Sequence, residues 1–153
     1  METKTQSNGS RLVTLAAPAA ADRALAAPIS ESTARVMGTM AVLGIGVIHI
    51  LDSAGTYHST RWIFWAYIAL IVASVPAAIV LLHWTSVLAW ALVTGVAAGP
   101  LIAYLWSRSI GLPGDASDIG NWLCTLGMVA LFVESSLLAL SITRIRGARR
   151  RIA

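Results

Sequence analysis

Four long apolar stretches, separated by short polar segments, dominate the chain. They occupy residues 36–54, 62–82, 87–106 and 122–142. A transmembrane helix needs about 20 mostly apolar residues to cross about 30 Å of hydrocarbon, and each stretch approaches that length. Because lipid offers no partner for backbone N–H and C=O groups, such stretches must be helical. The pattern therefore predicts an all-α fold, an integral membrane four-helix transmembrane bundle.

The segments around these stretches predict the domain organisation. Residues 1–33 are polar or rich in alanine and proline, so we expect a disordered cytoplasmic N-terminal tail. The transmembrane domain follows at 34–143, and a basic cytoplasmic C-terminal tail at 144–153 ends the chain. Arginines gather beside the first and last spans, whereas the loops on the other side hold only Arg61 and Arg108. Cytoplasmic flanks carry the excess of Lys and Arg, which predicts a multi-pass protein of the cell (plasma) membrane with both termini inside.

Aromatic residues mark the two predicted membrane boundaries. Trp84 lies in a tight turn at 83–86 on the predicted cytoplasmic side, and the two predicted outer loops cover 55–60 and 107–119. Trp and Tyr are enriched at membrane interfaces. The residues expected in the outer belt are Tyr57, Trp62, Trp65, Tyr104, Trp106 and Trp122.

Composition supports a membrane protein and excludes other classes. Of the 153 residues 57% are hydrophobic and 12% are charged, whereas soluble domains carry about 25% charged residues. The net charge of +4 comes from arginines that flank the spans, so it does not predict nucleic-acid binding, which needs a basic face with interleaved aromatics. A single cysteine, Cys124, excludes an internal disulfide.

Small residues predict where helices pack. Gly95 and Gly99 form a GxxxG pattern in the third span, which lets another helix approach closely. A second pattern recurs every seven residues in and before the fourth span, and we expect this small and polar stripe to face the bundle interior. Its members are Gly120, Gly127, Glu134 and Ser141.

Glu134 is the carboxylate inside the fourth span. A charge at the bilayer centre costs roughly 2.5–3.5 kcal/mol on insertion scales. Ser74 and Thr94 lie at a similar predicted depth. In one hypothesis a protonated Glu134 donates a hydrogen bond to such a neighbour and fixes helix packing. In the other it carries a proton or a cation through the bundle.

Polar residues also gather at the predicted outer mouth. His49 and Asp52 share a helix face, and with His58 they are candidate ligands for a transition metal, or for haem through imidazole. The alternative is a hydrogen-bonded polar cap in which arginine–aspartate pairs tie the two outer loops together. The residues of that cap are Arg61, Arg108, Asp115 and Asp118.

A longer motif surrounds these outer residues. Residues 104–114 read Tyr-Leu-Trp-Ser-Arg-Ser-Ile-Gly-Leu-Pro-Gly, and residues 118–122 read Asp-Ile-Gly-Asn-Trp. Together with Val133-Glu134, they resemble a group of small four-span membrane proteins common in actinobacteria, which share the pattern YLxSRxxGLPG, then DxGNW, then VE. The resemblance covers residues 36–142 and implies the four-span topology. Many of those proteins have a Glu-Pro pair where this chain has Cys124 and Thr125.

The sequence predicts a function in which the protein catalyses no reaction. No nucleophile triad, phosphate loop or nucleotide fingerprint is present, so we expect a non-enzymatic accessory or oligomerising subunit without a cofactor. Its partners would be the lipid bilayer and either a second copy or another membrane protein. The alternative is a binding or transport protein for a metal, haem or protons that uses the outer His/Asp cluster and Glu134. A membrane enzyme with the histidines as acid–base groups ranks third.

Overall fold

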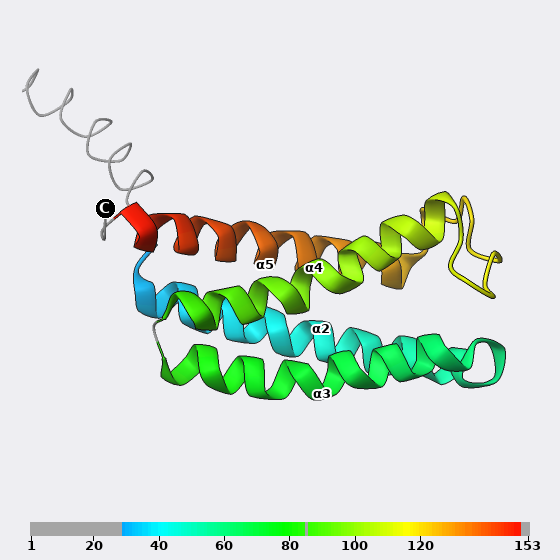
Figure 1. The fold of residues 1–153 in the computed structure, drawn as a ribbon, viewed down its shortest axis with the longest axis horizontal. Helices are drawn as coiled ribbons and strands as arrows, with labels where there is room; N and C mark the ends of the chain where they lie inside the picture. Colours follow the sequence, from blue (N-terminus) through cyan, green and yellow to red (C-terminus); the bar gives the residue numbers. More distant parts are fainter. Residues whose placement is uncertain (1–28, 85, 151–153) are drawn as a thin grey trace, which may run out of the picture. The chain divides into compact units, whose positions relative to one another are not determined.

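The described residues form helices joined by short connections. The computed structural model describes residues 29–84 and 86–150. In that part of the chain there are four helices, α2 (Glu31–Ser59), α3 (Arg61–His83), α4 (Val87–Ser109) and α5 (Thr125–Arg150) (Figure 1). Each is long and apolar enough to cross a membrane. The all-α prediction is confirmed, and the chain is a multi-pass membrane protein.

Two helices extend beyond the predicted spans. α2 begins at Glu31, inside the predicted tail, and continues to Ser59 through the predicted outer loop, so only Thr60 separates it from α3. α5 begins at Thr125 and continues through Arg150, across most of the predicted C-terminal tail. Hydropathy marks only the part of a helix that lies in hydrocarbon, whereas arginine is a good helix former outside it. The predicted disorder of residues 1–28 lies outside the described residues.

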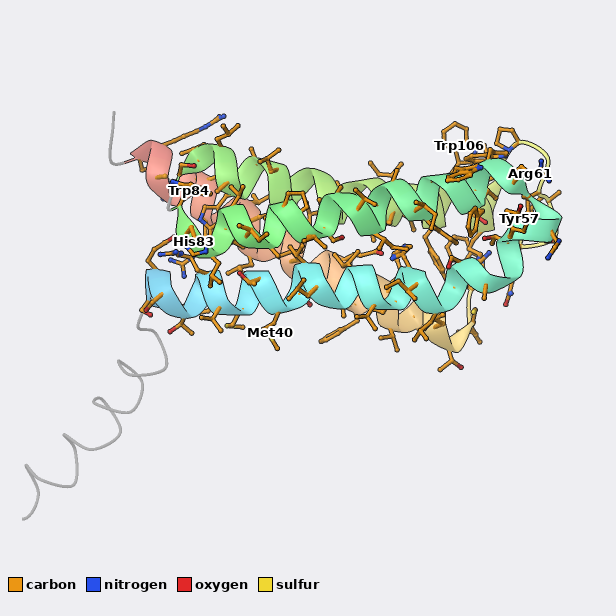
Figure 2. All side chains as sticks on the ribbon, turned by 90° about the horizontal axis from the view of Figure 1, so that it is seen from below. Met40, Tyr57, Arg61, His83, Trp84 and Trp106 are labelled. Carbon is orange, nitrogen blue, oxygen red and sulfur yellow. The ribbon has the colours of Figure 1, made fainter. Side chains whose placement is uncertain are left out.

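The two ends of the bundle differ in structure. The first turn of α2, the last turn of α5 and the α3–α4 connection lie together at one end, which we call the turn end (Figure 1). The α4–α5 connection, residues 110–124, forms an irregular hairpin at the opposite, hairpin end. Figure 2 shows Trp84 at the turn end and Tyr57 and Trp106 at the hairpin end. These three aromatics thus lie at opposite ends of the bundle, as the predicted division between two boundaries requires.

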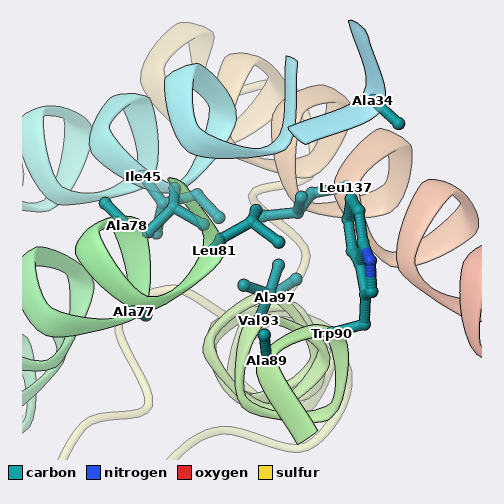
Figure 3. Close-up of a cluster of buried hydrophobic side chains, with 11 residues drawn as sticks. Ala34, Ile45, Ala77, Ala78, Leu81, Ala89, Trp90, Val93, Ala97 and Leu137 are labelled. Carbon is teal, nitrogen blue, oxygen red and sulfur yellow. The ribbon is translucent and has the colours of Figure 1, made fainter. Parts of the chain in front are cut away.

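The tightly packed core lies in the half of the bundle near the turn end (Figure 3). α2 packs along α3 and α5, and α4 packs along α5. Side chains pack directly on the backbone at Gly38, where a Cβ atom would lie 2.7 Å from a Leu81 methyl carbon and 3.2 Å from the Trp90 ring. The main core side chains are Ala34, Val42, Ile45, Ala77, Ala78, Leu81, Ala89, Trp90, Val93, Ala97 and Leu137.

Polar contacts fasten the turn end. Glu31 accepts a hydrogen bond from Trp90 Nε1 at 3.3 Å and pairs with Arg144 at 3.4 Å. Arg35 Nε donates to the carbonyl of Leu81 at 3.0 Å. α2 is thereby joined to the three other helices at this end, and the acidic residue that the sequence placed in a tail is part of the bundle.

Tight turns hold the hairpin, as its Gly-Leu-Pro-Gly sequence predicts. Gly111 and Gly114 adopt φ of 81° and 77°, a left-handed conformation that glycine adopts without steric cost. Leu112 and Asp115 exchange two backbone hydrogen bonds of 2.9 and 2.8 Å. Trp62 Nε1 on α3 donates to the carbonyl of Pro113 at 2.8 Å. The hairpin is therefore connected to α3 as well as to α4 and α5.

Candidate functional site

A cavity of about 660 Å³ occupies the half of the bundle near the hairpin end. α4 contains Pro100, and a proline inside a helix commonly bends it. α4 diverges from α3 toward the hairpin end (Figure 1). Side chains of all four helices and of the hairpin line the resulting space, which we call the chamber, and most of them are apolar.

His49 and Glu134 meet in the chamber wall. His49 Nε2 on α2 lies 3.8 Å from Glu134 Oε1 on α5, and the two residues are only 6% and 1% exposed. The sequence prediction placed His49 at the outer mouth and Glu134 deep in the bundle, as parts of separate sites. The structure combines them because α2 and α5 pack against each other with these two faces inward.

The contacts of His49 and Glu134 show which polar atom of the pair lacks a described hydrogen-bond partner. His49 Nδ1 lies 2.9 Å from the carbonyl oxygen of Ile45, and a carbonyl only accepts, so Nδ1 carries a hydrogen. Nε2 then faces Glu134 Oε1 at 3.8 Å, an electrostatic contact longer than a hydrogen bond. Glu134 Oε2 is buried and has no hydrogen-bond partner among the described residues. A buried polar atom without a partner is costly, so Oε2 is the atom of this site that a bound molecule could satisfy.

Tyr67 on α3 joins the same polar group. Its hydroxyl donates to Asp52 Oδ2 at 2.8 Å, and its ring meets the His49 ring edge-on, with the centroids 5.1 Å apart. Sequence reasoning missed Tyr67, because a tyrosine in an apolar span gives no signal of which neighbour it will face. The sequence did predict that His49 and Asp52 share a helix face. This prediction is confirmed, since both residues line the chamber.

Arg108 lies at the hairpin end of the chamber. It forms an ion pair with Asp118 and lies over the Tyr104 ring, 4.8 Å from its centroid. The Tyr104 hydroxyl donates to the carbonyl of Trp122 at 3.0 Å. Arg108 is 9% exposed, and its Nε has no hydrogen-bond partner in the described part of the chain. The sequence predicted that Arg108 belongs to an arginine–aspartate pair, and the structure gives Asp118 as its partner.

The remaining residues of the predicted polar cap lie apart from this pair. Asp115 also lines the chamber, but it accepts from the backbone N–H and hydroxyl of Ser117 at 3.2 and 2.6 Å. Arg61 lies 5.7 Å from the centroid of the Tyr57 ring. The prediction that arginine–aspartate pairs tie two outer loops together is wrong, because α2 is helical through Ser59, and Arg108 in the last turn of α4 pairs with Asp118 in the connection that follows the same helix.

His58 does not join the other two candidate metal ligands. It is exposed and stacks edge-on against Tyr57, with the centroids 5.0 Å apart. Because α2 is continuous, His49 and His58 are nine residues apart on one helix, about two and a half turns, which places them on opposite faces. Within residues 29–84 and 86–150, no three His, Cys, Asp or Glu side chains gather in reach of one metal ion.

Ser74 and Thr94 do not bond to Glu134. Thr94 Oγ1 donates to Ser141 Oγ at 2.9 Å, and Ser74 Oγ donates to the carbonyl of Leu70 at 2.8 Å. Ser141 lies seven residues beyond Glu134 on α5, about 10 Å nearer the turn end. Neither residue is therefore the partner of Glu134 in this structure, since both lie closer to the packed core.

The predicted packing glycines have three different roles. Gly127 packs on α4, where a Cβ atom would lie 2.5 Å from Tyr104 Cε2. Gly120 precedes α5 and adopts φ of 79° in the hairpin, so it is not part of the interior stripe. Gly95 and Gly99 are exposed and line the chamber, with no described atom within 4 Å of a Cβ built on either. Within one copy of the chain they leave space beside α4 and contact no other described helix closely.

These contacts define the class of protein. It is a multi-pass membrane protein of four helices whose half near the hairpin end encloses an apolar chamber with a buried His–Glu pair and an Arg–Asp pair. No protein-family profile, curated protein or solved structure matches the chain.

Proposed function

We propose that the protein binds one small amphiphilic molecule in the chamber. The observation that carries this proposal is the chamber itself, an apolar space of about 660 Å³ with two buried polar atoms that lack partners among the described residues. Sites for small molecules are typically clefts of roughly 300–1,000 Å³ with apolar walls and a few convergent polar groups. A molecule with an apolar body and a polar group matches both parts of the lining.

The position of the opening supports access from the membrane. Ala66, Ala69 and Ala73 on α3 and Gly95 and Gly99 on α4 line the chamber and are exposed. They lie in the middle parts of helices that are long enough to span the bilayer. Small side chains on both sides leave a gap at the depth of the hydrocarbon layer, where an amphiphile dissolved in the lipid reaches it directly.

Replacing Ala69 by phenylalanine is expected to weaken binding about tenfold, because the new ring occupies the chamber. The probe is N-phenyl-1-naphthylamine, titrated into the purified protein and counted as a one-to-one adduct by native mass spectrometry. Ala91→Phe is the matched control, because Ala91 is also exposed in the apolar part of a helix but does not line the chamber. Equal binding by both variants, or no saturable adduct with the unaltered protein, contradicts the proposal.

The earlier functional predictions relate to the chamber in different ways. The accessory or oligomerising subunit stays a prediction, although Gly95 and Gly99, its expected packing face, line the chamber in a single copy of the chain. The metal or haem alternative also stays a prediction; of its candidate ligands His49 and Asp52 line the chamber, whereas His58 lies on the opposite face of α2 from His49. The His49–Glu134 pair could still serve proton handling, so proton handling stays a prediction alongside ligand binding.

We also propose that the protein lies in the plasma membrane with the turn end in the cytoplasm. Arg35, Arg144, Arg146, Arg149 and Arg150 lie at that end, and cytoplasmic flanks carry the excess of basic residues. A cysteine placed at Ser86 should therefore be protected from an impermeant maleimide in intact cells, in a background where Cys124 is replaced by serine. A cysteine at Ser117 in the hairpin should be labelled, and the reverse result contradicts this orientation.

A further inference from the structure

The charges that line the chamber are unbalanced. Asp52, Asp115 and Asp118 outnumber Arg108, and the His49–Glu134 pair is neutral when it shares one proton, which leaves a net charge of −2. Walls of low dielectric constant focus such a field into the cleft and raise the local concentration of the opposite charge. The lining therefore favours a cationic ligand over an anionic one.

The oxygen without a described hydrogen-bond partner at the inner end of the chamber, Glu134 Oε2, also favours a cationic ligand. Glu134 Oε2 has no hydrogen-bond partner among the described residues, and it is a free acceptor whenever the carboxylate is ionised or holds its proton on Oε1. A ligand donor placed against Oε2 satisfies the atom in these states. An ammonium group supplies both donors and positive charge, and a charge-assisted hydrogen bond is stronger than one between neutral groups.

The arginine is too far away to repel a cation at this place. Gly127 packs against Tyr104, so these two residues lie at one level of the bundle. Arg108 is one turn beyond Tyr104 toward the hairpin, and Glu134 is two turns beyond Gly127 in the other direction. The helical rise then separates Arg108 and Glu134 by roughly 16 Å along the axis. In addition, Arg108 is already paired with Asp118.

From these observations we propose that the ligand is an amphiphilic amine, with its ammonium group against Glu134 Oε2 and its apolar body in the chamber. This inference rests on the proposed binding function and names the chemical class of its ligand.

The test compares three probes that differ only in their head groups. Decylamine, decanol and decanoic acid compete with N-phenyl-1-naphthylamine for the purified protein at pH 7, where the amine is a cation and the acid an anion. We expect the amine to displace the naphthylamine at about one tenth of the concentration that the alcohol needs, and the acid to be the weakest competitor. Equal potency of the three, or a preference for the acid, overturns the inference.

Glu134→Gln tests the position of the ammonium group. Glutamine keeps the size of the side chain but removes the carboxylate that faces the ammonium group, so the preference for the amine should decrease while the alcohol competes as before; the part of the preference that comes from the three aspartates should remain. Glu31→Gln is the matched control, since it removes a carboxylate that does not line the chamber. A preference for the amine that is as strong in Glu134→Gln as in Glu31→Gln overturns the inference.

The experiments distinguish failure of the proposed ligand class from failure of the proposed binding function. Saturable naphthylamine binding without discrimination among the head groups contradicts only the amine class. Absence of any saturable adduct contradicts the binding function itself. The head-group series on the unaltered protein needs no variant, so poor folding of Glu134→Gln does not prevent a decision.

Discussion

Replacing Gly127 by valine is expected to destabilise the bundle by about 2–3 kcal/mol, the range in which overpacking of a tight contact lies. A Cβ atom at Gly127 would lie 2.5 Å from Tyr104 Cε2 and 3.2 Å from the Tyr104 hydroxyl oxygen. The tyrosine cannot move without losing its hydrogen bond to Trp122 and its contact with the Arg108 guanidinium. α4 and α5 must therefore separate at this level. Unfolding by SDS in mixed micelles, followed by tryptophan fluorescence, measures the loss.

Gly147→Val is the control for this change. Gly147 lies in the last turns of the same helix, and a Cβ atom built on it meets no described atom within 4 Å. Both variants exchange glycine for the same β-branched residue in a helix, so intrinsic helix propensity contributes similarly to each. If Gly127→Val loses no more stability than Gly147→Val, the close contact between α4 and α5 at Tyr104 is contradicted.

Asp118→Ala is the second change with a large expected effect, a loss of about 2 kcal/mol, because it leaves the buried guanidinium of Arg108 without its counter-ion. Arg108 is 9% exposed, whereas Asp118 is 37% exposed. Solvent screening of the aspartate reduces the effect below that of a fully buried pair. The same SDS titration measures it, and faster proteolysis of the hairpin should accompany the loss.

Asp115→Ala provides the comparison within the same hairpin. Asp115 accepts hydrogen bonds only locally, from Ser117, so its loss should cost less than that of Asp118. A second substitution, Arg108→Leu in the Asp118→Ala background, should recover part of the stability, because it removes the unpaired charge. Equal losses for the two aspartates, with no recovery in the double variant, would show that the Arg108–Asp118 pair does not hold the hairpin.

Local patterns in the sequence were sufficient for the elements and their order. Apolar runs predict the four helices, because crossing hydrocarbon requires that length whatever the neighbours are. The Gly-Leu-Pro-Gly segment predicts a tight hairpin, since turn chemistry depends on adjacent residues. The Arg108–Asp118 pair was accessible for a similar reason, because the two residues are only ten positions apart in the chain.

The chamber could not be predicted from local patterns in the sequence. In lipid a helix is apolar on most of its surface, so hydrophobic periodicity does not mark the face that turns inward. Met40, Leu88 and Phe132 are 67%, 69% and 73% exposed in this bundle, although they are as apolar as core residues. The GxxxG pattern likewise identifies a small-residue face but not what that face meets. Gly95 and Gly99 thus face a cavity where close packing was predicted.

The sequence by itself determined that the chain has four membrane-spanning helices, a tight turn at one end and a rigid hairpin at the other, because length, hydropathy and turn chemistry are local properties. Only the tertiary structure decided that His49 meets Glu134, that Tyr67 joins Asp52, and that His58 lies on another face. Those contacts depend on the rotation of each helix about its own axis and on the depth at which it meets its neighbours. Packing among all four helices sets both quantities.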